Sequence, residues 1–126
     1  MLSLLLDEKM SSVIADGVQA RRPEISIQSI YSWRDGTLLS QPDRAILAAA
    51  AADGLTLVTL DVNTIMPLVA EWNAAGQTHA GVVFVDQWTI RPDDFGRLIR
   101  ALEQLWDLAH HWDWTNLADF LRAPTD

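Results

Sequence analysis

The stretch that decides the fold is Leu2-Ser-Leu-Leu-Leu6, an apolar run that ends on Asp7-Glu8. It has a counterpart in Leu55-Thr-Leu-Val-Thr-Leu60, which ends on Asp61. Short apolar runs of this kind are typical of buried strands. In an open parallel sheet, ligands bind beyond the carboxyl ends of the strands, where the strand order reverses. Acids placed there face one another across a crevice, and Mg²⁺ and Mn²⁺ prefer oxygen ligands. The two runs therefore predict a metal site at this edge of a sheet.

Strand and helix patterns alternate along the whole chain. Apolar runs predict strands at 2–6, 25–30, 55–60 and 81–85, and longer patterns predict helices at 11–22, from 40 or 41 to 53, 64–75 and 92–109. This alternation indicates one α/β domain over 1–126, with a doubly wound four-stranded parallel sheet and helices on both faces. A short helical pattern at 115–121 adds a C-terminal helical extension over 107–126.

Composition restricts the chemistry and the partners. The chain has 126 residues and no cysteine, which excludes disulfides, thiol nucleophiles and thiolate metal sites. Its opening apolar run ends at Asp7, too early for a signal peptide or a membrane span, so a cytoplasmic protein without a membrane partner is expected. The net charge of −8 opposes non-specific attraction to nucleic acid.

Four segments in a fixed order resemble a known family. They are Leu4-Leu-Leu-Asp-Glu8 with Met10-Ser11, Gly36 with Asp43-Arg-Ala-Ile-Leu47, Asp53-Gly-Leu-Thr-Leu-Val-Thr-Leu-Asp61, and Gly81-Val-Val-Phe84. Together they are similar to the PIN-like nuclease superfamily, in its branch of short bacterial single-domain proteins. The resemblance implies a PIN-type sheet with strand order 2-1-3-4 and a Mg²⁺- or Mn²⁺-dependent ribonuclease site. It further implies a role as the toxin of a toxin–antitoxin pair, with RNA as substrate and an antitoxin-like protein as partner.

The resemblance also assigns site residues. Asp7, Asp43 and Asp61 match the family's catalytic, metal-binding acids, and Glu8 matches a frequent second acid. Asn63 stands where the family usually places a further acid, and its carbonyl oxygen is an uncharged ligand. Further departures are Lys9, the only lysine, and Ala45 in place of a second acid near Asp43.

Each acid also has a simpler interpretation. Asp7 and Asp61 suit the N-caps of the helices that follow them. Asp43 suits the first turn of a helix, where the macrodipole favours an acid. Asp86 follows the fourth strand and either completes the ring of acids or starts a turn.

Two other function classes stay open. The strand-end acids with Met66-Pro67 suggest a phospho-accepting receiver domain, although the lysine that such a domain needs after a later strand is missing. Asn63, Ala45 and the acidic charge favour a catalytically weak or inactive PIN-like module that works through protein interaction.

Six tryptophans are many for this length, and Trp106, Trp112 and Trp114 lie in the apolar C-terminal segment. Tryptophan is enriched at interfaces, so a homodimer contact or a partner-docking element is expected there. The alternative is a segment folded back onto the domain's own core. Trp33 lies in a loop on the same rim as the acids, where it either stacks on a base or packs down.

Overall fold

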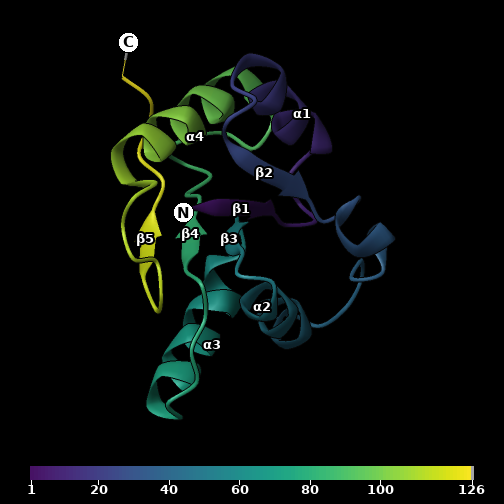
Figure 1. Ribbon diagram of the computed structural model, residues 1–126, viewed down its shortest axis with the longest axis vertical. Coiled ribbons are helices and arrows are strands. Elements are labelled where there is room, and N and C mark those ends of the chain that lie inside the picture. Colours follow the sequence, from purple (N-terminus) through teal and green to yellow (C-terminus); the bar gives the residue numbers. More distant parts are fainter. Residues whose placement is uncertain (126) are drawn as a thin grey trace.

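The computed structural model describes residues 1–125 as a five-stranded, all-parallel sheet in the order β2-β1-β3-β4-β5, with helices on both faces (Figure 1). The elements are β1 (Ser3–Leu6), α1 (Ser12–Arg21), β2 (Ser26–Ser29), the short 3₁₀ turn η1 (Trp33–Gly36), α2 (Asp43–Ala52), β3 (Thr56–Thr59), α3 (Val62–Ala74), β4 (Val82–Phe84), α4 (Phe95–Ala109) and β5 (Ala118–Phe120).

The α/β class, the parallel sheet and the order of the first four strands are as the sequence predicts. The boundaries shift by a few residues. The second helix begins at Asp43, later than predicted, because Ser40 adopts a left-handed φ of 62° and Pro42 is extended at the N-cap. The fourth begins at Phe95, where the Asp94 side chain accepts a hydrogen bond from the Arg97 amide and caps the helix.

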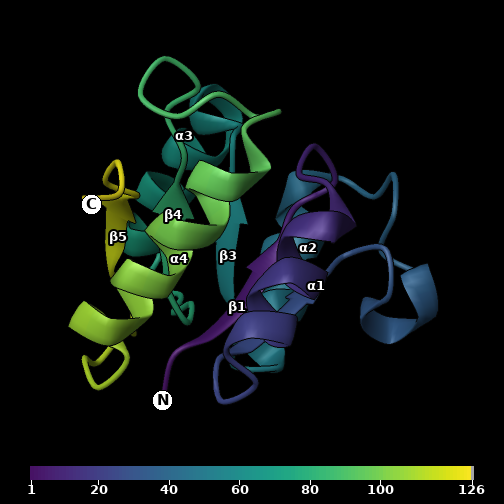
Figure 2. The same cartoon turned by 90° about the horizontal axis from the view of Figure 1, so that it is seen from above.

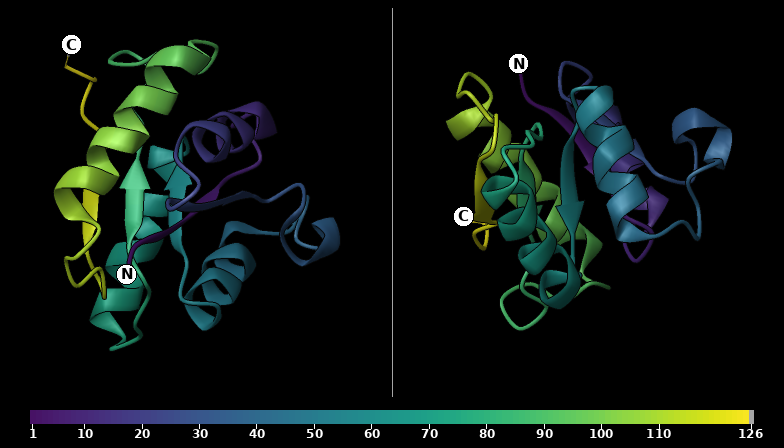
Figure 3. Two further views of the ribbon diagram at one scale, coloured as in Figure 1. Left: turned by 45° about the horizontal axis from the view of Figure 1, so that its top comes forward. Right: turned by 90° about the horizontal axis from the view of Figure 1, so that it is seen from below.

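The sheet separates two apolar layers, since successive residues of a strand point to opposite faces. Leu4 and Leu6 of β1 pack under α1 and α4, whereas Leu5 packs against α2 and α3. Figure 2 shows α1 and α4 together on one face, and the right-hand view of Figure 3 shows α2 and α3 on the other. Leu4, Leu5 and Leu6 are fully buried, and each contributes about 1.5–3 kcal/mol to folding.

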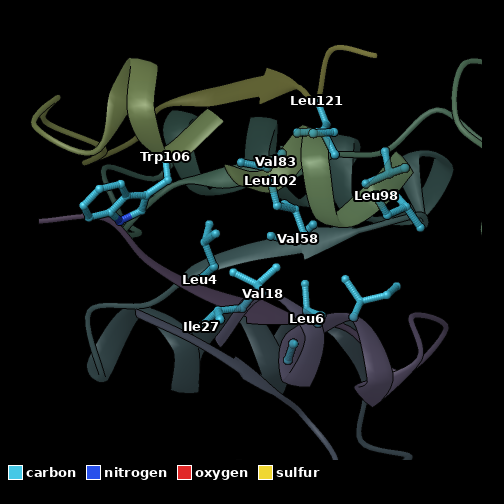
Figure 4. Packing of buried hydrophobic residues seen from close by; sticks show 14 of the residues in the cluster. Leu4, Leu6, Val18, Ile27, Val58, Val83, Leu98, Leu102, Trp106 and Leu121 are labelled. Atoms are coloured by element: carbon cyan, nitrogen blue, oxygen red, sulfur yellow. The ribbon is translucent and has the colours of Figure 1, made fainter. Parts of the chain in front are cut away.

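The larger layer fills the space between the sheet and α1 with α4. Figure 4 shows Leu4, Leu6 and Val58 of the sheet beneath Leu98 and Leu102 of α4. Because these strands are buried on both faces, they read as continuous apolar runs, which is why the sequence locates them well.

The predicted helical extension over 107–126 is wrong for the described residues beyond Ala109, and residue 126 lies outside the described part of the chain. Helix α4 ends at Ala109, and the chain then turns back to form β5, which pairs in parallel with β4. The spacing of Leu117, Phe120 and Leu121 suits a helix, but contacts distant in sequence decide otherwise. The Asn116 amide donates to the His79 carbonyl at 2.9 Å, and the His79 amide donates to Asn116 Oδ1 at 3.1 Å. The sheet therefore has five strands instead of four.

The crossover connection from β4 to β5 has an unusual handedness. Helices α1 and α4 cover the same face, yet β1 to β2 and β4 to β5 step in opposite directions across the sheet. The crossovers through α2 and α3 lie on the other face and step toward β5, which gives them the same hand as the crossover through α1. The crossover through α4 is therefore of the opposite hand, whereas parallel sheets use one hand almost throughout. Topology rules thus do not predict β5.

Two of the C-terminal tryptophans pack into the chain's own core. Trp106 and Trp114 are buried there, and the Trp114 indole donates to the Ala109 carbonyl at 2.9 Å. Trp112 remains 39% exposed. Folding back onto the core thus accounts for two of the three, and the homodimer stays a prediction. Trp33 also packs down, with its indole donating to Asp53 at 2.9 Å.

Within residues 1–125, no helix combines the length and the apolar character that a membrane crossing requires.

The turn into β4 yields a test of the link between β4 and the C-terminal segment. Gly81 has a φ of 104°, and a Cβ there would lie 3.0 Å from the Trp114 carbonyl oxygen. Gly76 has a φ of 73° with open space around it. We expect Gly76→Ala to cost about 1–2 kcal/mol from the left-handed backbone alone. Gly81→Ala should cost a further ~1–3 kcal/mol from the steric overlap. Urea unfolding measures both, and equal losses would contradict the contact.

Candidate functional site

The candidate site lies where the strand order reverses, between β1 and β3. These two strands pair directly, and their neighbours β2 and β4 lie on opposite sides. Asp7 follows β1 at once, and its amide donates to the Val58 carbonyl at 3.0 Å. Asp61 follows β3 by one intervening residue. Both acids therefore stand at the carboxyl edge, where ligands of doubly wound sheets bind.

Neither of these two acids caps a helix with its side chain. The N-cap of α1 is Ser11, whose hydroxyl accepts from the Val13 amide. Asp61 occupies the N-cap position of α3, but its side chain makes no capping hydrogen bond. The capping interpretation is therefore wrong for Asp7, whereas Asp61 stands at the N-cap of α3 without a side-chain capping bond.

The Asp7 carboxylate is fixed by its own surroundings. It is 6% exposed, with Oδ1 accepting from the Glu8 amide at 2.7 Å and Oδ2 accepting from the Thr59 hydroxyl at 2.8 Å. The same hydroxyl oxygen accepts from the Asp61 amide at 3.0 Å. Thr59 thus connects two of the expected ligands, and sequence analysis did not single it out. The only feature of the sequence that could have indicated Thr59 is its position on β3, two residues before Asp61.

Asp43 joins Asp7 and Asp61 from the start of α2. The pKa of its carboxyl is raised, first by burial, then by the negative charges of Asp61 and Asp7, while the Lys9 ammonium opposes the shift. An interaction with the Asp61 carboxyl further favours the protonated form of Asp43. We name these three carboxylates, Asp7, Asp43 and Asp61, the acid group. Asp7 follows β1, Asp43 begins α2 and Asp61 follows β3, so the group draws on three separate elements.

The other expected ligands lie around this group in different ways. The Glu8 carboxylate accepts a hydrogen bond from the Ser40 amide, which directs it toward the loop before α2. Asn63 is exposed in the first turn of α3 and lines the same cavity as Asp61. Asp86 also lines this cavity, but its carboxylate accepts from the Trp88 amide and the Thr89 hydroxyl, each at 3.0 Å. Asp86 therefore starts a turn.

A cavity of about 620 Å³ opens at the carboxyl ends of β3, β4 and β5. We call it the strand-end cavity. Its lining comprises Lys9, residues 60–63 and 85–88, Pro92 and Phe120. The Asp61 and Asp86 carboxylates and the Lys9 ammonium share it with the aromatic side chains of Trp88 and Phe120, so the cavity has a charged part and an apolar part.

The oxygen atoms present decide how well a divalent cation fits. Within residues 1–125, no three histidine or carboxylate side chains are placed to hold one metal ion together. Asp43 and Asp61 accept no side-chain hydrogen bond from a donor in the described residues, whereas both Asp7 oxygens are occupied. The donor set is therefore a carboxylate pair with the Asn63 carbonyl nearby. Such a set fits Mg²⁺ or Mn²⁺, which keep several waters and bind through one or two carboxylates.

Comparison with known proteins yields no match to a family model, to a curated protein or to a solved structure.

The raised pKa of Asp43 makes stability depend on pH. Because the folded state disfavours the ionised carboxyl, this residue's contribution is fully present below its ordinary pKa of 3.8 and is lost as the pH rises through the higher folded-state value. We expect Asp43→Asn to be more stable than wild type at neutral pH without divalent cations, and the difference to vanish in acid. Urea unfolding across pH measures this. Asp16→Asn, on an exposed part of α1, controls for the loss of one charge; an identical gain there would contradict the local origin.

The bridge through Thr59 yields a matched pair of variants. Thr59→Val keeps the shape but leaves the buried Asp7 carboxylate without its hydroxyl donor. Thr56→Val, on the same strand, removes a hydroxyl that donates to the neutral Ala80 carbonyl at 2.7 Å. We expect about 2–3 kcal/mol of lost stability for Thr59→Val and ~1 kcal/mol for Thr56→Val, because a bond to a charged group is worth more. Urea unfolding at neutral pH compares them, and a smaller loss for Thr59→Val would remove Thr59 from the site.

Proposed function

We propose that this protein is a PIN-like, divalent-cation-dependent ribonuclease. The observation that carries the proposal is the convergence of Asp7, Asp43 and Asp61 from three elements at the reversal of strand order. The raised pKa of Asp43 supports it: burial is the first cause, the charges of Asp61 and Asp7 add to it, and a bound cation would offset those two charges. The absence of side-chain capping by Asp7 and Asp61 supports it as well.

Each residue has a definite role in this proposal. The Asp43 and Asp61 carboxylates hold Mg²⁺ or Mn²⁺, with the Asn63 carbonyl as a weaker neighbour. Asp7 adds negative charge from a fixed position, since the Thr59 hydroxyl and the Glu8 amide hold both of its oxygens. When bound, the cation lowers the pKa of a coordinated water and offsets the charge that develops on the phosphate oxygens. Lys9, which lines the cavity beside Asp61, provides a cationic contact for a phosphate.

The acidic charge of the chain shapes how RNA would bind. With a net charge of −8, the surface repels a polyanion, and the acid group adds to that repulsion at the site itself. RNA binding should therefore depend on the divalent cation, unlike the non-specific binding of a basic protein.

The resemblance in the sequence leads us to propose the toxin of a toxin–antitoxin pair as the biological setting. A small antitoxin-like reading frame beside this one in the genome tests that setting directly.

A second candidate is a catalytically inactive interaction module of the same fold. The Lys9 ammonium favours it, because this cation already offsets part of the charge that faces Asp43. Asn63 favours it too, since an amide replaces a charged ligand. The two candidates differ in one measurable property, cleavage of RNA in the presence of metal.

The deciding experiment is a metal titration of cleavage. We expect wild type to cut single-stranded RNA in Mn²⁺, Asp61→Asn to lose that activity with its fold intact, and Asn63→Asp to gain activity at low Mn²⁺, where occupancy limits the rate. The melting temperature should rise with Mn²⁺ for wild type and stay constant for Asp61→Asn. Asp16→Asn controls for charge alone. If neither wild type nor Asn63→Asp cuts in Mg²⁺ or Mn²⁺, the interaction module replaces the nuclease.

A further inference from the structure

One tryptophan has no partner in the core and stands at the strand-end cavity. Trp88 is 89% exposed, whereas Trp33, Trp72, Trp106 and Trp114 are buried. It lies in the loop between β4 and α4 and lines the cavity that also holds Asp61 and Lys9. A large indole left in water forgoes the stabilisation that its burial would bring, and because Trp88 lines a cavity, its ring is available to a ligand there.

The loop that carries Trp88 is well fixed. The Asp86 carboxylate accepts from the Trp88 amide and the Thr89 hydroxyl, and the Asp86 carbonyl accepts from the Thr89 and Ile90 amides, all at 3.0 Å. Ile90 is 1% exposed and anchors the far side of the turn in the core. The turn therefore holds the Trp88 backbone in place and leaves its side chain in solvent.

A second aromatic side chain lines the same cavity. Phe120 of β5 is 43% exposed, and its ring packs against Phe84 with centroids 5.4 Å apart. The cavity thus has an aromatic part, formed by Trp88 and Phe120, and a charged part, formed by Asp61, Asp86 and Lys9. Its volume of about 620 Å³ lies within the usual range for small-ligand sites.

Cationic side chains around the loop suit a phosphate chain. Lys9 lines the cavity, and the Arg97 guanidinium of α4 donates to the Thr89 carbonyl of the same loop at 3.5 Å. Arg97 forms no ion pair with the described residues, whereas the nearby Arg91 is paired with Asp93 at 3.2 Å. An aromatic face with cations beside it is the arrangement by which proteins bind single-stranded nucleic acid.

We propose that Trp88 stacks on an unpaired base of single-stranded RNA whose adjoining phosphate lies toward Lys9 and Asp61. This inference rests on the proposed function, and it assigns a base-contacting residue beside that same site. Base stacking requires an open π-face, which a paired base in a duplex does not offer, so the site should select single strands. Stacking is tolerant of sequence, so little base preference is expected from Trp88 itself.

The test separates binding from cleavage. Fluorescence anisotropy of a short, labelled, mixed-sequence RNA is measured in Ca²⁺, with the full chain and with Trp88→Ala, Trp88→Phe and Trp112→Ala. We expect Trp88→Ala to weaken binding roughly tenfold, as the loss of one base–aromatic stack does. Trp88→Phe should retain most of the affinity. Trp112→Ala, which removes an exposed tryptophan outside this cavity, should bind as wild type does.

Three further arms decide the ligand. A duplex of the same length should bind more weakly than the single strand, and loss of Trp88 should not change duplex binding. Adenosine monophosphate binding as tightly as the oligonucleotide, with the same dependence on Trp88, would overturn the assignment to an RNA chain. Unchanged binding by Trp88→Ala, or no RNA binding by wild type, would overturn the stacking role. A change of oligomeric state in Trp88→Ala would instead identify Trp88 as a subunit contact and overturn the proposal.

The outcome is distinguishable from that of the proposed nuclease. Trp88-dependent binding in Ca²⁺ without cleavage in Mn²⁺ would support the base-binding role and remove the catalytic one. Equal cleavage by wild type and Trp88→Ala in Mn²⁺ would support the catalytic role and remove the base-binding role of Trp88.

Discussion

The Thr59 hydroxyl links the two strand ends that carry Asp7 and Asp61, and the candidate site depends on this link. It donates to the buried Asp7 carboxylate and accepts from the Asp61 amide, so it links the ends of β1 and β3 across the reversal of strand order. Without that donor, a 6% exposed carboxylate would lose one of its two hydrogen bonds. An unsatisfied buried carboxylate is costly, and this cost keeps Asp7 in a single orientation.

The ionised Asp43 carboxylate works against folding. Burial and two neighbouring charges raise the pKa of Asp43, which means that the folded state holds negative charge at an unfavourable place. The positive charge of Lys9 offsets part of this negative charge. Proteins retain such unfavourable arrangements mainly at functional sites, where the strain serves a ligand. A cation between Asp43 and Asp61 would turn the repulsion into attraction, and this is the physical reason to regard the group as a site instead of a surface accident.

The unusual crossover through α4 builds the opposite side of the cavity. To reach β5, the chain runs through the loop that carries Trp88, along α4, and back past Trp114. The strand that results brings Phe120 to the carboxyl edge beside β4, where it packs on Phe84. The aromatic part of the cavity therefore depends on a strand added by contacts at Gly81, His79 and Asn116. Asp61 and Lys9, on the charged side, depend only on the segments that follow β3 and β1.

The sequence by itself determined the first four strands, the four helices and the acids at the strand ends. It could do so because buried parallel strands are continuous apolar runs, and because local rules of capping and periodicity set the helices. Only the tertiary structure decided what these local patterns leave open. It placed Asp7 outside the cap of α1, because Ser11 caps that helix and the Thr59 hydroxyl binds the Asp7 carboxylate. It made 118–120 a strand where spacing favoured a helix, and it buried Trp106 and Trp114 while leaving Trp88 exposed. Each of these outcomes rests on contacts between residues far apart in the chain, and local sequence patterns carry no record of such contacts.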